Sequence, residues 1–148
     1  DYQIYSAIPD FEKQLLHRND NEYEKLNLVQ IITHESVHNQ IFKKHSKWGK
    51  PTIPGWINEG YCEYISYKPI GNKNDYHLVN LISKLETDKN EDWIKTEYGT
   101  WTPRYYIHDR ALIEFLIDEK GFEITSIIAD KDLDPQKVYK EMKEKFGF

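Results

Sequence analysis

Two histidines and a glutamate stand together at a spacing that suits metal chemistry. The segment reads His34-Glu35-Ser36-Val37-His38, so the two histidines are four residues apart. On a helix, residues at this spacing lie about 6 Å apart along the axis and project to one side, so both imidazoles can reach a single ion. Glu35 lies one step around the helix, where it can reach a water on the metal without displacing a ligand. The pattern therefore predicts a zinc site with His34 and His38 as ligands and Glu35 as the catalytic base.

A catalytic zinc ion usually has three protein ligands and one open position, so a third ligand is needed. His45 comes seven residues after His38, but on a continuous helix it lies about 10.5 Å further along the axis, outside coordination range. The metzincin pattern requires a glycine and a histidine three and six residues after the second histidine. Ile41 and Lys44 occupy those positions here, which excludes that pattern.

Glu59 is the better candidate for the third ligand. It stands near the start of a second predicted helix, and the proline-rich loop before that helix allows it to fold back against the first. Glu63 follows four residues later on the same face. It can accept a hydrogen bond from the non-ligating nitrogen of one histidine, which would fix the orientation of that ring. We expect Glu59 to be a ligand and leave the role of Glu63 open.

Apolar residues at helical spacing predict the elements that must position these side chains. The first helix should begin after an N-cap at Asp20 or Asn21 and carry the two histidines, and the break after it contains Pro51 and Pro54. A short strand is possible at residues 2–8, and residues 87–104 are expected to be a loop. The predicted helices span residues 22–44, 55–67, 75–86 and 105–119, the last ending at Gly121, and a final helix follows Pro135.

Composition narrows the class of protein. The 148 residues carry a net charge of -5, which argues against a nucleic-acid partner, and suit one domain with one core. Cys62 is the only cysteine, and its apolar neighbours predict a packed thiol. No apolar run approaches the ~20 residues needed to span a membrane.

Because the chain starts at Asp1, we expect residues 1–148 to be a processed or trimmed part of a longer protein. The tryptophans are expected in the core, with a cleft as the alternative; they are Trp48, Trp56, Trp93 and Trp101.

The two motifs together resemble those of the gluzincin metallopeptidases, in which H-E-x-x-H is followed on a second helix by a glutamate ligand. Residues 56–60 read W-I-N-E-G, similar to the W-L-N-E-G of the zinc aminopeptidase superfamily. Glu59 followed by Glu63 is similar to the thermolysin pattern, where an aspartate four residues on supports a ligand histidine. The resemblance implies a mainly α (α+β), zincin-like catalytic domain. Such a domain would have an active-site helix, a second ligand-bearing helix and at most a small N-terminal sheet.

A further resemblance covers residues 106–121, which look like the helix after the active site in small peptidase-MA-like domains. In those domains a tyrosine opens the helix and faces the zinc. This implies that Tyr106 stabilises the oxyanion, with Tyr105 and His108 as alternatives. The G-x-M-E-N segment that holds the substrate's free amine in aminopeptidases is missing, since Met142 is the only methionine. Aminopeptidase specificity is therefore not implied.

The sequence predicts a zinc metallopeptidase that holds one Zn²⁺ ion and acts on a peptide or protein substrate. If residues 2–8 form an exposed strand edge, an extended peptide can pair with it. Two alternatives stay open: a non-catalytic zincin-fold binding domain with structural or absent zinc, and a helical interaction domain without metal. The oligomeric state is open, and a secreted or cell-envelope location is preferred.

Overall fold

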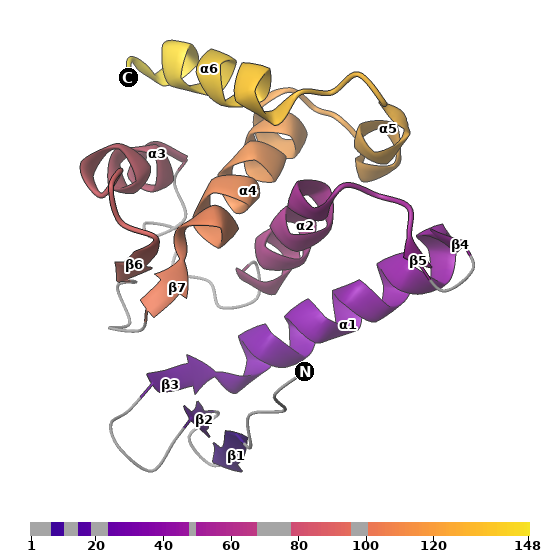
Figure 1. The fold of residues 1–148 in the computed structure, drawn as a ribbon, viewed down its shortest axis with the longest axis vertical. Helices are drawn as coiled ribbons and strands as arrows, with labels where there is room; N and C mark the ends of the chain where they lie inside the picture. Colours follow the sequence, from indigo (N-terminus) through magenta and orange to yellow (C-terminus); the bar gives the residue numbers. More distant parts are fainter. Residues whose placement is uncertain (1–6, 11–14, 19–23, 48–49, 68–77, 96–100) are drawn as a thin grey trace.

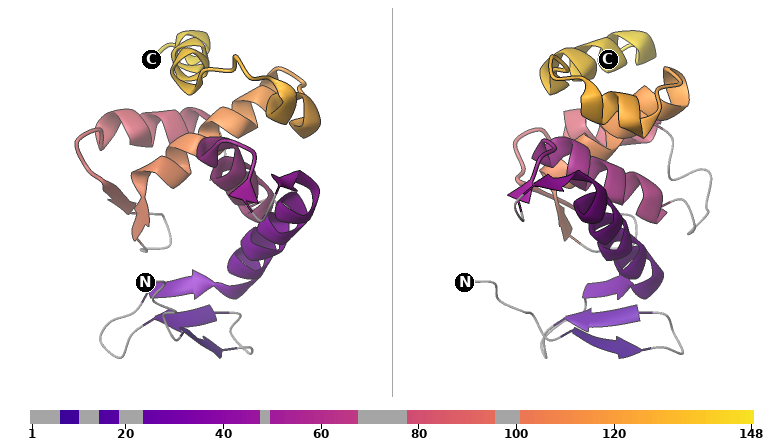
Figure 2. Two further views of the ribbon diagram at one scale, coloured as in Figure 1. Left: turned by 45° about the vertical axis from the view of Figure 1, so that its right-hand side comes forward. Right: turned by 90° about the vertical axis from the view of Figure 1, so that its right-hand side faces the viewer.

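The computed structural model describes residues 7–10, 15–18, 24–47, 50–67, 78–95 and 101–148, and these are mainly helical. Three short strands come first: β1 (Ala7–Asp10), β2 (Leu15–Arg18) and β3 (Glu24–Asn27). They form an antiparallel sheet in the order β1-β2-β3, which leads directly into helix α1 (Leu28–His45) (Figure 1). Both views in Figure 2 place this sheet at one end of the molecule and helix α6 (Pro135–Phe146) at the other.

The start of the first helix was predicted wrongly. Residues 24–27, expected to be helical, form β3 and pair with β2, with Leu26 opposite Leu16. Leucines at this spacing fit either a helix or a strand, and the pairing with the preceding strand β2, which residues 24–27 do not themselves show, decides between them. Asp20, Asn21 and most of residues 2–8 lie outside the described residues, although β1 does include residues 7 and 8.

The second predicted helix is confirmed at both ends. After the two-residue strands β4 (Ser46–Lys47) and β5 (Lys50–Pro51), helix α2 runs over Gly55–Tyr67. The carbonyl oxygen of Pro54 accepts hydrogen bonds from the N–H groups of Ile57 and Asn58, each at 3.1 Å, which anchors the first turn. Cys62 on this helix is fully buried, as a packed thiol should be.

Helix α4 (Arg104–Glu114) lies at the centre of the molecule, between α2 and α3 (Leu78–Thr87) (Figure 1). It continues as a π-helical segment, η2 (Phe115–Glu119), and Gly121 follows with a φ of 73°, the left-handed conformation expected at a helix end. The predicted apolar stripe of α3 is confirmed, because Leu78, Leu81, Ile82 and Leu85 are all buried. With side chains of α2, α4 and α6 they form the core.

Two parts of the C-terminal half differ from the prediction. The expected loop at residues 87–104 contains an antiparallel ribbon of β6 (Trp93–Lys95) and β7 (Trp101–Pro103). Trp93 and Trp101 are about half exposed, so their assignment to the core was wrong, whereas Trp56 does pack partly buried against it. Trp48 lies outside the described residues. The six-residue helix α5 (Ile124–Ala129) was not predicted, whereas α6 starts at Pro135 as expected. None of the described helices is long and apolar enough to cross a membrane.

Candidate metal centre

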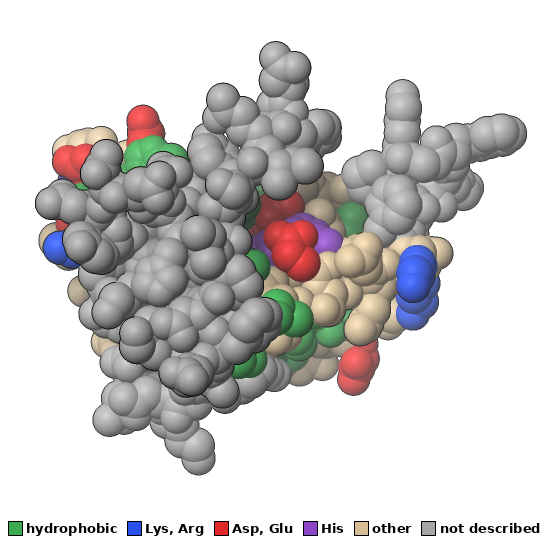
Figure 3. Space-filling model, turned by 90° about the horizontal axis from the view of Figure 1, so that it is seen from below, with side chains coloured by type: hydrophobic (Ala, Val, Ile, Leu, Met, Phe, Trp, Pro, Cys, Tyr) green, Lys and Arg blue, Asp and Glu red, His purple; other side chains and the backbone are tan. Residues whose placement is uncertain are grey.

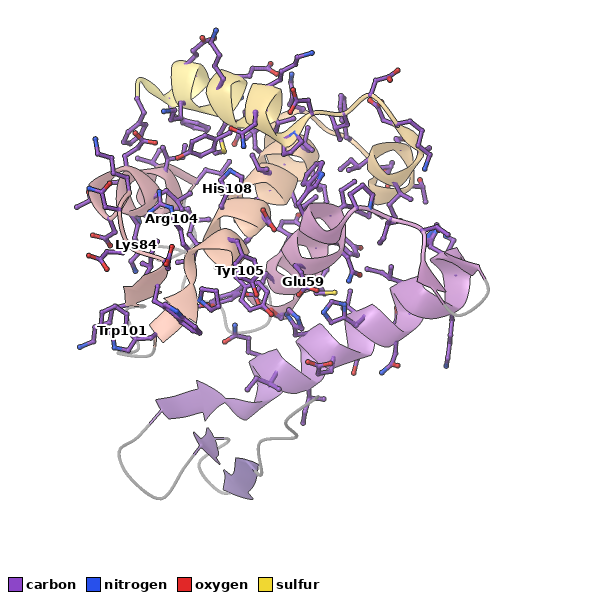
Figure 4. All side chains as sticks on the ribbon, in the orientation of Figure 1. Glu59, Lys84, Trp101, Arg104, Tyr105 and His108 are labelled. Atoms are coloured by element: carbon purple, nitrogen blue, oxygen red, sulfur yellow. The ribbon has the colours of Figure 1, made fainter. Side chains whose placement is uncertain are left out.

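Three side chains from two helices bring their ligand atoms together. His34 and His38 project from α1, and their Nε2 atoms are 2.9 Å apart. The Glu59 carboxylate comes from α2, with Oε2 3.6 Å from Nε2 of His34 and 3.3 Å from Nε2 of His38. Figure 4 shows Glu59 on the side of α2 that faces α1. Among the described residues these three form a group that can hold a metal ion, and His45 is not part of it.

The spacing of the three ligand atoms can be tested against zinc. Zinc binds histidine nitrogen and carboxylate oxygen at about 2.0–2.2 Å, so two ligands of a tetrahedral site lie roughly 3.3–3.5 Å apart. The three observed separations, 2.9, 3.3 and 3.6 Å, lie around that value. Two imidazole nitrogens and one carboxylate oxygen also match a known ligand set of catalytic zinc, which leaves one position for water or substrate. The donor set therefore fits the ion.

The second nitrogen of each histidine ring has its own hydrogen-bond acceptor. Nδ1 of His34 lies 2.9 Å from Oε1 of Glu63, and Nδ1 of His38 lies 3.3 Å from Oδ1 of Asn58. Acceptors at both Nδ1 atoms favour the tautomer that carries hydrogen there and leaves the Nε2 lone pair for a metal. The structure thus places Glu63 where the sequence suggested.

Asn58 was missed in the sequence. Besides facing His38, it donates from Nδ2 to Oε1 of Glu59 at 3.4 Å, so one amide contacts two of the three candidate ligands. Its place immediately before Glu59 was the available signal. Neighbouring helix residues usually project to different sides, however, so that position alone did not indicate a shared site.

Electrostatics couples the three candidate ligands. Burial opposes protonation of His34, but hydrogen bonds to Glu59 and Glu63 outweigh it and raise its pKa to about 9. The hydrogen bond to Glu59 likewise raises the pKa of His38. Burial opposes the charge on Glu59, but the two histidines outweigh it and lower its pKa to about 2. A cation is therefore favoured at this place, and a metal ion that binds there displaces protons from the histidines.

The site is reachable from solvent. The side chains of His38 and Glu59 are 24% and 26% exposed, whereas that of His34 is 11% exposed. Seen from below, histidine and acidic side chains lie together on the molecular surface (Figure 3). Glu35, the next residue after His34 on α1, has an exposed side chain. The residue is therefore accessible to water.

Of the three residues considered for the oxyanion, Tyr106 contacts a candidate ligand. Its ring centroid lies 6.0 Å from that of His34, edge to face. Burial raises the pKa of Tyr106, aided by a hydrogen bond with Tyr105 and by the charge of Glu59, so the phenol keeps its proton at neutral pH. His108 instead packs its ring 4.9 Å from that of Tyr139 on α6, with Nδ1 3.0 Å from Asp109 Oδ1.

A glycine allows the two helices behind the site to approach each other closely. A Cβ atom placed on Gly60 would lie 2.4 Å from the backbone oxygen of Asp109 on α4, a distance that real Cβ atoms essentially never show. Because glycine has no Cβ atom, the backbones of α2 and α4 can pack directly against each other at Gly60. Glu59 lies just before Gly60 on α2, and Tyr106 lies just before Asp109 on α4. The packing of these two helices therefore sets the position of both side chains relative to α1.

Comparisons of the chain with protein-family models, with curated proteins and with solved structures gave no significant match.

Proposed function

We propose that the protein is a zinc-dependent metallopeptidase of the gluzincin type, in which His34, His38 and Glu59 hold one zinc ion. The observation that carries the proposal is the convergence of three ligand atoms whose histidine rings are both hydrogen-bonded at their other nitrogen. Two histidines that merely shared a helix surface would not require the nearby carboxylate of Glu59, nor hydrogen-bond acceptors at both Nδ1 atoms. The mainly helical fold, with the ligands on two packed helices, agrees with a zincin-like domain.

Hydrolysis of an amide requires a nucleophile, a base and a donor for the developing negative charge. Zinc bound here would supply Lewis acidity and lower the pKa of a coordinated water toward ~7. Glu35 accepts the proton of the attacking water and transfers it to the leaving nitrogen. Its position beside His34 on α1, with an exposed carboxylate, suits this role.

The remaining residues of the site stabilise the negative charge that develops on the substrate oxygen or hold the ligand histidines in position. The phenol of Tyr106, protonated and close to His34, donates a hydrogen bond to the substrate oxygen as that oxygen gains charge. Glu63 and Asn58 hold the two imidazole rings in the orientation that presents Nε2. Both act through the ligand rings that they contact, so we assign them positioning roles.

The test is the Glu35→Gln variant, measured for zinc content and for cleavage of a peptide library. Glutamine keeps the shape of the side chain but is not a base, so cleavage should fall at least about 100-fold while zinc stays bound. Glu91→Gln, the same change on an exposed glutamate before β6, is the matched control and should cleave normally. Undiminished cleavage by the Glu35 variant would remove Glu35 from the mechanism. Bound zinc without cleavage by the unaltered protein would favour a binding domain.

A further inference from the structure

The ribbon of β6 and β7 has one face in the core and one face in solvent. Trp93 pairs with Pro103, and Lys95 pairs with Trp101. Side chains two residues apart on a strand point to the same side, so these four share one face. Ile94 points to the other side and is 1% exposed, whereas Trp93 and Trp101 are 52% and 50% exposed. Two half-exposed tryptophans on one small face form an exposed apolar patch. Such patches commonly mark binding sites.

This face borders a groove of about 580 Å³, within the range of pockets that bind small organic groups. The wall is mostly aromatic rings and a proline, with one acid and one base. The lining residues are Asp92, Trp93, Pro103, Arg104, Tyr105 and His108.

The groove is joined to the candidate metal centre through two tyrosines. The ring of Tyr105, which lines the groove, lies 4.6 Å from the ring of Tyr106, centroid to centroid. The ring of Tyr106 in turn lies 6.0 Å from that of His34. In the view of Figure 4, Tyr105 lies between Trp101 and Glu59. The two contacts place the rings of Tyr105 and His34 at most about 11 Å apart, and an extended peptide rises about 3.3 Å per residue, so up to about three residues cover this distance.

The charges of the groove favour an uncharged occupant. The Arg104 guanidinium donates hydrogen bonds to the backbone oxygens of Leu85 and Asp88 at the end of α3, so these donors are already used within the protein. Asp92 is exposed and opposite in charge to Arg104, so the one carboxylate and the one guanidinium of the lining offset each other. Faces of tryptophan, tyrosine and proline gain most from burying a flat apolar group.

We propose that this groove is a substrate subsite that binds a bulky apolar side chain, preferably an aromatic one, of an extended polypeptide. That side chain lies two or three residues from the bond that is cleaved. The subsite rests on the proposed peptidase function, because it names the class of substrate that the same active site takes.

The first experiment measures binding without turnover, using the zinc-loaded Glu35→Gln protein. The probes are nine-residue peptides of glycine and serine that carry one phenylalanine, and the same peptides with alanine or lysine in its place. The phenylalanine peptide should bind about tenfold more tightly than the other two, and Trp93→Ala should reduce this ratio to near one. Trp93→Phe should keep the preference, and thermal melting shows whether each variant is folded.

Phe122→Ala is the matched control, because Phe122 is also an exposed aromatic residue but lies beyond η2, at the other end of α4. It should leave the preference intact. Equal binding of the three peptides, or a preference that survives Trp93→Ala, would overturn the subsite. Binding of an oligomer of N-acetylglucosamine that depends on Trp93, with no peptide preference, would also overturn it.

Cleavage by the unaltered protein separates the subsite from the peptidase function. Hydrolysis two or three residues from the phenylalanine is the result expected if both are right. Cleavage without any preference for phenylalanine would contradict the subsite alone. Preferential binding of the phenylalanine peptide with no cleavage would contradict the peptidase function and leave the groove as a peptide-binding site.

Discussion

Gly60→Ala should destabilise the protein although it adds a single methyl group and improves helix propensity. The new Cβ would lie 2.4 Å from the oxygen and 2.7 Å from the carbon of the Asp109 carbonyl, and 2.9 Å from Cγ1 of Ile113. Ordinary contact for a Cβ begins near 3.4 Å, so α2 and α4 must separate by about 1 Å. The atoms that it meets first belong to the backbone, which cannot move aside as a flexible side chain does.

The size of the effect follows from two opposing contributions. Overpacking of a core costs about 1–3 kcal/mol, and a clash with backbone belongs at the upper end of that range. Replacement of glycine by alanine inside a helix returns about 1 kcal/mol. The net loss should be about 2 kcal/mol, which for a chain of this size lowers the melting temperature by roughly 4–8 °C. Zinc affinity should fall too, because Glu59 is the neighbouring residue on α2.

Urea and thermal unfolding of the zinc-free and zinc-loaded proteins would measure both effects. Gly55→Ala is the matched control, since a Cβ on Gly55 at the start of the same helix meets nothing within 4 Å. That variant should be as stable as the parent protein or slightly more stable. Equal stability of the Gly60 and Gly55 variants would refute the close packing of α2 on α4 and, with it, our account of how Glu59 is positioned.

Three further predictions concern the metal centre. Tyr106→Phe should lower kcat about 100-fold with zinc content unchanged, because a hydrogen-bond donor to the oxyanion is lost; an unchanged kcat in steady-state assays would exclude that role. Glu63→Gln should weaken zinc binding about 10- to 100-fold in a chelator competition, because the partner of His34 Nδ1 is weakened, and unaltered affinity would contradict the positioning role. In zinc-free protein, the raised pKa of His34 contributes stability that is fully present below about pH 6.5 and is lost as the pH rises through about 9. Urea unfolding in a chelator at several pH values should show this loss, and saturating zinc should flatten it; a stability that rises over this window would contradict the His34–carboxylate pairing.

The accuracy of the sequence prediction depended on whether local residues determine each element. The start of helix α2 was predicted correctly because Pro54 and Gly55 mark the break before it. The strands β1 to β3 are four residues long and depend on pairing with the next strand, which their own residues do not show, so residues 24–27 were assigned to the helix that follows them. Trp93 and Trp101 were placed in the core because tryptophan is usually buried, and the three-residue strands β6 and β7 are too short for alternation to indicate otherwise.

The candidate site was likewise predictable from the sequence only in part. The spacing of His34 and His38 defines one helical face, and Glu59 followed from the motif beyond the loop, so the convergence of these three was anticipated. The contacts of Asn58 with His38 and Glu59 depend on how α2 is rotated against α1. The aromatic groove depends on a ribbon that joins the start of α4. Neither arrangement has a pattern in the sequence that local rules can read.

The metal content of the protein, purified after zinc-replete expression and dialysed without a chelator, tests the central claim most directly. Two histidines and a carboxylate held at these separations should retain one zinc ion per chain, and Glu59→Ala should lose most of it. Less than about half an equivalent of zinc in the unaltered protein would contradict the proposal that His34, His38 and Glu59 form a zinc site.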